Sequence, residues 1–587
     1  MMFKKVAFTL ASVALPFLVL LLLEAGLRGV GVKASERTAF EPVPGHADHQ
    51  VFNPAYAARY FQGFRPSVAY NPFRREKAEG TFRVFVLGGS SAAGFPYHFY
   101  YAFPERLAQR LVAVGAGRRI EVVNLGMTAV NSYTLWDLAG LVAEQEPDAV
   151  LIYAGHNEYY GAFGAGSTIY ALGNRPLLKR LLLRLKHSVL YLLLEDLLTP
   201  DVPEETTDRT MMARVVRDAG IAPGGEVFRA GIAQFEANMA DVIERFREAG
   251  IPVYLGTLTS NLMDQPPLGE DAAAQAAYEE GRRWLVQGDT LRAREAFERA
   301  RELDPIRFRA PGAINEVIRR LAAAPGVTLV PVDEVFRRHS PGGLEGKALF
   351  DDHLHPNARG YDLMAEAFFE AMRPALVAAE EEADVRPLAP DPYEQALVDL
   401  QLARLKGGYP FEKRVTPEEA NRRFTERLQH RRRAGYADSL AVLTITRGYP
   451  PPEALLTAFQ TARARRDTLT ALHVAYGLLA WQPFNRALKD QAVGLAVARE
   501  RPEEVVPALL RMAVRTTYTT DHLNALAAVE LRHRRLGVAS HWLAEVEHRD
   551  PGDPVMLYNR ARLLVLQGDT LAARAYYERY REAVQSR

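Results

Sequence analysis

Two short segments of the sequence contain the residue types that nucleophilic catalysis requires. One holds Ser90 within Leu-Gly-Gly-Ser-Ser-Ala-Ala-Gly, and the other holds Asp352 and His355 within Asp-Asp-His-Leu-His-Pro-Asn. A serine hydroxyl becomes a nucleophile when a neighbouring base removes its proton. The three-residue spacing lets the Asp352 carboxylate bond one imidazole nitrogen of His355 and leaves the other nitrogen for the serine. We therefore predict Ser90, Asp352 and His355 as a catalytic triad, with Ser91 as a competing nucleophile.

Two further segments contain groups that can stabilise negative charge on a reacting carbonyl oxygen. Gly126 offers a backbone N–H that no side chain obstructs, and Asn157 carries an amide N–H. Together with the N–H of Ser90, these donors would form an oxyanion hole. By itself the Gly126 segment better suits an ordinary strand-to-helix turn, and Asn157 also suits a buried turn residue. The prediction of an oxyanion hole from Ser90, Gly126 and Asn157 therefore depends on all the segments meeting at one place.

A metal site is the alternative interpretation of the last segment. Asp351, His353 and His355 are all potential ligands. No further cluster of histidines or carboxylates supplies the rest of a coordination shell, and the chain contains no cysteine. We therefore favour the triad over a metal, and we predict no cofactor.

These segments follow short apolar runs that alternate with amphipathic stretches. Runs with almost no polar alternation are typical of strands buried on both faces of a parallel sheet. Helical spacing occurs between them, at residues 105–114 and 235–248, and a last helix is predicted at 357–376 after Pro356. The pattern predicts a doubly wound α/β fold. The predicted strands cover residues 83–87, 120–124, 149–153, 252–256 and 328–332.

Helical hairpins interrupt and follow this pattern. The segment 268–306 is predicted to be an inserted helix-turn-helix. Its residues 287–299 are similar in sequence to residues 567–579. A small residue facing a large aromatic one at these positions resembles the packing of tetratricopeptide repeats. We predict an all-α, tetratricopeptide-like domain over residues 385–587, although residues 390–470 show no recognisable repeat.

The segment that contains the serine and the segment before the last helix resemble two sequence blocks of the SGNH/GDSL hydrolases. Ser90 matches the serine of the family's Gly-Asp-Ser motif, while Gly89 replaces its aspartate. Asp352 and His355 match the family's Asp-x-x-His pair, which Pro356 follows as is usual there. The resemblance implies that Ser90 is the nucleophile and that Asp352 and His355 activate it.

The two middle segments resemble the remaining blocks of the family, in the same order. Gly126 matches the glycine of the second block, and Asn157 matches the Asn of Gly-x-Asn-Asp, where Glu158 replaces the final Asp. The resemblance covers residues 80–376 apart from the insert and implies a three-layer, flavodoxin-like parallel sheet. It places the hydrolase-like domain at residues 31–380, where residues 31–80 are predicted to be irregular.

Composition narrows the classes of function. The chain has 587 residues, of which 48% are hydrophobic and 24% charged, so it is long enough for more than one globular domain. Its 72 Lys and Arg residues balance 71 Asp and Glu residues. The resulting charge of +1 does not favour a nucleic-acid partner, which a basic surface would attract.

The N-terminus has the pattern of an uncleaved signal anchor. Lys4 and Lys5 precede the apolar run Val6–Leu23, and no small-x-small cleavage site follows. We predict a transmembrane helix in residues 1–30 and a catalytic domain held in the cell envelope, outside the cytoplasm. A second leucine-rich, basic stretch at 175–198 would be either a cover over the domain or a helix on an anionic membrane surface, with the cover favoured.

The sequence therefore predicts a membrane-anchored serine esterase that acts on an ester-bearing small molecule, glycan or lipid. One alternative is an acyltransferase of the same fold that modifies envelope glycans, since water and hydroxyl acceptors use the same triad. Another is a non-catalytic scaffold whose helical repeats bind a protein partner.

Overall fold

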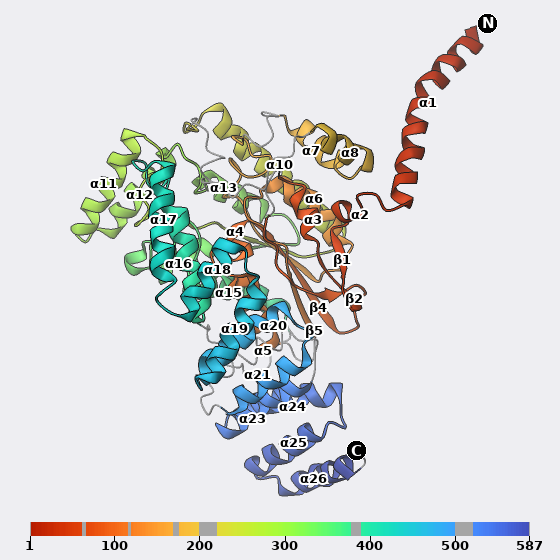
Figure 1. The fold of residues 1–587 in the computed structure, drawn as a ribbon, viewed down its shortest axis with the longest axis vertical. Coiled ribbons are helices and arrows are strands. Elements are labelled where there is room, and N and C mark those ends of the chain that lie inside the picture. Colours follow the sequence, from red (N-terminus) through yellow and green to blue (C-terminus); the bar gives the residue numbers. More distant parts are fainter. Residues whose placement is uncertain are drawn as a thin grey trace.

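A computed structural model describes most of the chain, and Figure 1 shows its arrangement. A central sheet lies between two layers of helices, the N-terminal helix projects from this body, and the C-terminal helices extend from the other side. The described residues are 2–61, 66–114, 119–167, 175–198, 220–376, 389–498 and 520–585.

The central sheet has five parallel strands in the order β5-β4-β6-β7-β8. Every residue of the inner strand β4 is buried, in keeping with its apolar run Val84–Leu87. The predicted parallel α/β sheet is therefore confirmed. The strands are β4 (Thr81–Gly88), β5 (Arg119–Asn124), β6 (Ala149–Tyr153), β7 (Val253–Gly256) and β8 (Val327–Val330).

Helices cover both faces of this sheet. On one face α5 packs against α15, and α15 also contacts α14, β7 and β8. On the other face α10 packs between α6 and α13. This gives the three layers that the sequence predicts. The helices are α5 (Phe103–Val114), α6 (Ser132–Ala143), α10 (Glu226–Glu248), α13 (Gly312–Leu321), α14 (Val332–His339) and α15 (Ala358–Met372).

The insert between β7 and β8 is a pair of helices, α11 (Ala272–Val286) and α12 (Thr290–Leu303). A Cβ atom on Gly281 would lie 2.7 Å from the ring of Phe297. The absence of a side chain at Gly281 therefore lets the two helices approach closely, as the small-against-aromatic pattern indicates.

The C-terminal region is helical, as predicted, and its clearest pairs are α19 with α20, α23 with α24 and α25 with α26. Residues 390–470 are helical too, although no repeat is recognisable in their sequence. The helices are α16 (Pro392–Lys406), α17 (Pro417–Arg431), α18 (Tyr436–Arg447), α19 (Pro451–Ala464), α20 (Thr468–Trp481), α21 (Arg486–Ala498), α23 (Thr520–Arg532), α24 (Leu536–Arg549), α25 (Pro554–Gln567) and α26 (Thr570–Gln585).

The N-terminal segment consists of α1 (Met2–Gly29) and the short α2 (Ala34–Arg37). Among the helices of the described residues, none combines the length and the apolar character needed to cross a membrane. The prediction of a transmembrane helix in residues 1–30 is therefore not supported.

Residues 31–80 are less irregular than predicted. They contain a three-stranded antiparallel sheet, whose strands pair in the order β1-β2-β3. The rings of Phe40 and Phe73 pack edge-on against Phe85 of β4, and this apolar contact holds the small sheet against the main one. The added elements are β1 (Phe40–Val43), β2 (His46–Phe52), α3 (Pro54–Ala58) and β3 (Phe73–Arg74).

Candidate active site

The nucleophile segment turns sharply from β4 into the one-turn helix α4 (Ser90–Ala93). A Cβ atom on Gly88 would lie 2.3 Å from the carbonyl oxygen of Tyr153, so only glycine permits this turn beside β6. Ser90 begins the helix at the carboxyl end of β4. This is the edge where ligands bind in doubly wound folds.

Ser90, His355 and Asp352 form one chain of hydrogen bonds. The Oγ atom of Ser90 lies 2.7 Å from Nε2 of His355, and Nδ1 of the same ring lies 2.6 Å from Oδ2 of Asp352. The structure therefore brings together residues 265 positions apart in the chain, at distances that allow direct proton transfer.

The Asp352 carboxylate is buried and held by the backbone of its own loop. Its Oδ1 atom accepts hydrogen bonds from the N–H groups of Leu354, at 2.9 Å, and His355, at 2.8 Å. Burial by itself would raise the pKa of Asp352, but the neighbouring His355 and His353 rings lower it well below its ordinary value. The carboxylate thus stays ionised and can orient the imidazole.

Ser91, the competing nucleophile, has a different environment. Its side chain is buried, and its Oγ atom has no hydrogen-bond partner among the residues that the structure describes. Only Ser90 of the two serines contacts the imidazole of His355. The geometry therefore favours Ser90.

Asn157 lies close to the nucleophile turn. A Cβ atom on Gly89 would lie 2.9 Å from the Nδ2 atom of Asn157. One N–H of this amide donates to the carbonyl oxygen of Val130 at 3.1 Å, which orients the group and leaves its second N–H for another acceptor. Asn157 is thus placed as an oxyanion donor would be.

Gly126 also reaches the nucleophile turn, but its N–H already has a partner. A Cβ atom there would lie 2.5 Å from the backbone nitrogen of Ala93, so a glycine is required. The N–H of Gly126 donates to Oδ1 of Asn124 at 2.8 Å, while Nδ2 of Asn124 donates to the carbonyl oxygen of Ala92 at 2.9 Å. To serve as an oxyanion donor, the N–H of Gly126 would have to break its hydrogen bond to Asn124. The sequence did not point to this role of Asn124.

Glu158, which follows Asn157, holds the loop that carries both residues. Its carboxylate accepts hydrogen bonds from Oγ of Ser132 at 2.7 Å, from the N–H of Ser132 at 3.2 Å and from Nε2 of Gln234 at 2.7 Å. Burial raises the pKa of Glu158 to about 7. The position that departs from the family pattern therefore holds the Asn157 loop to α6 and α10.

The alternative metal site is only partly assembled. Donor atoms of Asp352, His353 and His355 lie within 4.8 Å of one another. Asp351 is not part of this group, since its carboxylate accepts a hydrogen bond from the hydroxyl of Tyr97 at 2.8 Å. Both ring nitrogens of His355 already contact Asp352 and Ser90, so these three residues suit the triad better than a metal.

Aromatic side chains surround the histidines of the site. The ring of Phe95 lies 4.6 Å from that of His355, and Phe411 lies 5.2 Å from His353. Phe308 lies 5.7 Å from the His353 ring on the same loop. Phe411 comes from the connection between α16 and α17, so the C-terminal region contributes directly to the surroundings of the site.

Helix α16 is bonded to both catalytic segments. At its beginning, Glu394 accepts hydrogen bonds from the backbone N–H and the Nδ1 atom of His98, both at 2.6 Å. Burial would lower the pKa of His98, but the Glu394 carboxylate raises it. At its end, the ammonium group of Lys406 donates to the carbonyl oxygen of Asp351. The helix therefore connects the chain that follows Ser90 with the loop that carries Asp352.

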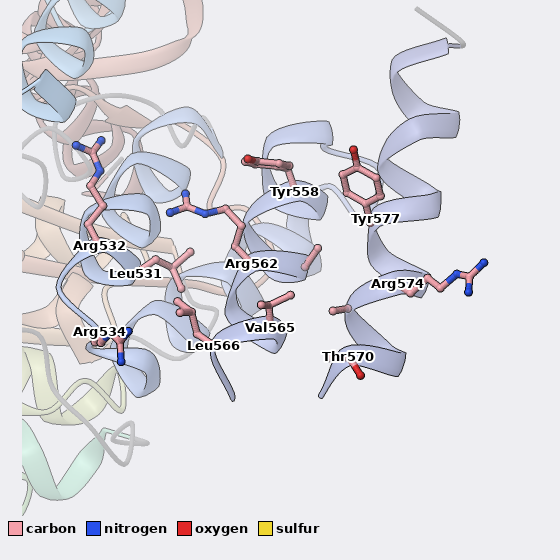
Figure 2. Close-up of a pocket in the computed structure, with 12 residues that line it drawn as sticks. Leu531, Arg532, Arg534, Tyr558, Arg562, Val565, Leu566, Thr570, Arg574 and Tyr577 are labelled. Atoms are coloured by element: carbon pink, nitrogen blue, oxygen red, sulfur yellow. The ribbon is translucent and has the colours of Figure 1, made fainter. Parts of the chain in front are cut away.

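A cavity of about 690 Å³ lies elsewhere, between α23, α25 and α26 (Figure 2). It contains no residue of the predicted triad, and no acidic side chain lines it. It is therefore a feature of the helical region and not of the catalytic residues. Its lining includes Arg532, Arg534, Tyr558, Arg562, Arg574 and Tyr577.

Comparison with known proteins gives one family match. Residues 86–363 match the family described as "GDSL-like Lipase/Acylhydrolase family". Among curated proteins, none matched the sequence.

Solved structures that resemble the chain include three hydrolases of low sequence identity. A GDSL-like lipase from Bacteroides thetaiotaomicron is 14% identical, covering 52% of this chain and 93% of its own, with a TM-score of 0.28. A lipase/acylhydrolase from Enterococcus faecalis is 15% identical, covering 51% and 100%, with a TM-score of 0.28. An acetylxylan esterase from Geobacillus stearothermophilus, as a catalytic mutant, is 14% identical, covering 51% and 96%, with a TM-score of 0.27.

Proposed function

Since residues 86–363 are a domain of the GDSL-like lipase/acylhydrolase family, we propose that this chain hydrolyses carboxylic esters with Ser90 as the nucleophile. The single observation that carries the proposal is the relay in which Asp352, His355 and Ser90 are joined by contacts of 2.6 and 2.7 Å.

The relay defines the proton movements of the reaction. The Nε2 atom of His355 accepts the proton of Ser90 while Oγ attacks the ester carbonyl carbon. Asp352 accepts the Nδ1–H bond and stabilises the imidazolium that forms. His355 then gives its proton to the leaving alkoxide, which departs as the alcohol and leaves an acyl group on Ser90. Water, activated by the same nitrogen, attacks this acyl-enzyme and releases the carboxylic acid.

The negative charge on the carbonyl oxygen requires donors at the carboxyl edge of the sheet. The proximity of the Asn157 amide to the nucleophile turn supports its second N–H as one of these donors. The backbone N–H of Ser90, at the start of α4, is the second donor in this proposal. One such donor contributes about 3 kcal/mol to the lowering of the barrier.

A fluorophosphonate probe tests the proposal, because it reacts covalently only with an activated serine. We expect the native chain and the Ser91→Ala variant to be labelled and the Ser90→Ala variant to remain unlabelled. Ser91→Ala is the matched control, since it removes the adjacent hydroxyl that lacks a contact with His355. Labelling that survives in Ser90→Ala, or no labelling of the native chain, contradicts the proposal, and the second result favours a non-catalytic scaffold.

The acceptor of the acyl group is a separate question from the nucleophile. An acyltransferase would use the same acyl-enzyme but pass the group to a hydroxyl of a glycan. Hydrolysis of 4-nitrophenyl acetate with and without an added oligosaccharide separates the two reactions. We expect acetate as the product in both cases, whereas acetylated oligosaccharide as the main product would identify a transferase.

A further inference from the structure

Three helices on one side of the molecule expose an unusual amount of apolar surface. In α1 every residue from Phe17 to Leu23 is 50% to 66% exposed. The helices α7 (Pro176–Leu185) and α8 (Val189–Leu198) also expose leucines, among them Leu177 at 82% and Leu197 at 81%. Contiguous apolar surface of this kind marks a site of interaction.

These helices are fixed to one another by polar contacts. The Glu24 carboxylate of α1 accepts hydrogen bonds from Oγ of Ser188 at 2.8 Å and from the N–H groups of Val189 and Leu190 at 2.9 and 3.0 Å. It therefore caps the start of α8, which explains why the leucine-rich stretch at 175–198 divides into two helices. Arg28 donates to the carbonyl oxygen of His187 at 2.8 Å.

A second contact holds the far end of α8 to the chain that follows α1. Lys33, just after α1, forms an ion pair of 2.7 Å with Asp196 near the end of α8. Figure 1 shows α7 and α8 beside the base of α1, on the opposite side of the molecule from α25 and α26. The exposed leucines of α8 thus continue the apolar surface of α1, and we call this surface of α1, α7 and α8 the apolar platform.

The arrangement of side chains on α1 indicates the kind of partner. Successive helical residues are rotated by about 100°, so seven consecutive apolar residues point in all directions around the axis. A folded partner covers one face of a helix, whereas a hydrocarbon medium surrounds it. A helix that is apolar all round is typical of contact with lipid.

The other two helices have the one-sided pattern of interfacial helices. On α7, Leu183 and Lys179 are buried against the body, while Leu177, Leu181 and Leu185 are exposed. Within residues 175–198, Arg175 and Arg184 are exposed cations, whereas Lys179 and Lys186 are buried. The two acidic residues of the segment, Glu195 and Asp196, are paired with Lys186 and Lys33. Apolar side chains beside exposed cations suit anionic lipid headgroups.

From these observations we propose that the apolar platform binds the surface of an anionic membrane, with α7 and α8 lying in the headgroup region and α1 entering the apolar layer. This inference does not depend on the ester-hydrolase proposal. It names a lipid surface as the occupant, and self-association through the same leucines is the competing outcome of the test.

The absence of cysteine from the chain allows a direct test with single labels. Leu177→Cys and Leu197→Cys place an environment-sensitive fluorophore on the platform. Leu571→Cys on α26 is the matched control, because Leu571 is 83% exposed and lies at the other side of the molecule. Each full-length protein is mixed with vesicles of phosphatidylcholine and phosphatidylglycerol in a 3:1 ratio or of phosphatidylcholine alone.

We expect the labels at 177 and 197 to shift to the blue and to be quenched by nitroxide lipids, while the label at 571 does not change. Phosphatidylglycerol should increase binding, and added salt should weaken it. The inference is overturned if the protein does not bind the vesicles, or if it binds while both platform labels stay in water. It is also overturned if both labels shift with protein concentration in the absence of vesicles, which would show self-association.

A second pair of variants measures the energetic contribution without labels. Leu177→Glu combined with Leu197→Glu should lower the vesicle partition coefficient of the unlabelled protein at least about tenfold, since each leucine loses its transfer to lipid. Leu571→Glu should leave the coefficient unchanged. Equal coefficients for all three proteins contradict a role of α7 and α8.

Discussion

Replacing Asp352 by asparagine should abolish almost all activity without disturbing the fold, and the structure shows why. Oδ1 of Asp352 accepts two backbone N–H groups, from Leu354 and His355. Asparagine must keep its carbonyl oxygen at this position, because an amide nitrogen there would face two donors. Its NH₂ group then points at Nδ1 of His355, 2.6 Å away in the native chain.

The consequence is a change of tautomer at His355. Facing a donor, Nδ1 must give up its proton, so Nε2 carries the proton and can no longer accept one from Ser90. In hydrolases that use the same three residue types, this change lowers kcat by about 10,000-fold. Such a fall corresponds to about 5 kcal/mol of activation free energy. KM should change little, because Asp352 is buried and does not reach the substrate.

The assay is steady-state hydrolysis of 4-nitrophenyl acetate, together with the rate of fluorophosphonate labelling, for native and Asp352→Asn proteins. Asp351→Asn is the control, since the adjacent carboxylate bonds Tyr97 and does not contact His355. We expect it to keep kcat within about threefold of the native value. A kcat for Asp352→Asn within tenfold of the native enzyme, or an equal loss in Asp351→Asn, would refute the tautomer argument.

Three further predictions concern groups around the triad. Asn157→Ala should lower kcat about 100-fold to 1,000-fold with little change in KM, and an unchanged kcat would exclude its amide from the oxyanion hole. The pKa of Glu158, raised by burial to about 7 from 4.5, means that the folded chain holds this proton more tightly than the unfolded chain. Its contribution to stability is therefore present at low pH and is lost as pH rises, by about 3 kcal/mol between pH 4 and pH 8. Glu158→Gln should remove this part of the pH dependence in urea unfolding, and identical slopes for both proteins would contradict it. Lys406→Met should lower kcat roughly fivefold, because it removes one hydrogen bond of about 1 kcal/mol to the loop of Asp351. Lys406→Arg should restore kcat. Equal rates for all three proteins would show that the contact has no catalytic effect.

The parts of the fold that could be predicted from sequence are those encoded locally. Continuous apolar runs such as residues 149–153 indicate buried parallel strands because every side chain in them must avoid water. The carboxyl ends of parallel strands share one edge, so residues that directly follow strands can be assigned to one site without knowing the rest. Ser90 and Asn157 could be placed in this way, and their neighbourhood in the structure follows from the sheet order.

The remaining features depend on contacts between distant segments that leave no local pattern. The capture of the Gly126 N–H by Asn124 depends on the path of the turn after β5, and a sequence does not reveal it. The division of residues 175–198 into two helices requires Glu24, more than 150 positions earlier. Phe411 lies next to His353, and it comes from the turn between α16 and α17, whose sequence contains no catalytic motif.

The contacts of α16 change how the helical region should be regarded. A docking module needs only a linker to the enzyme that carries it. In contrast, the first turn of α16 is bonded to His98 through Glu394, and its last residue, Lys406, is bonded to Asp351. The first contact lies eight residues after Ser90, and the second lies one residue before Asp352. A helix of fixed length between these points sets the separation of the two loops that must meet for proton transfer. Because the helical region supplies both contacts, it belongs to the support of the 2.7 Å contact between Ser90 and His355 and is not a separate module.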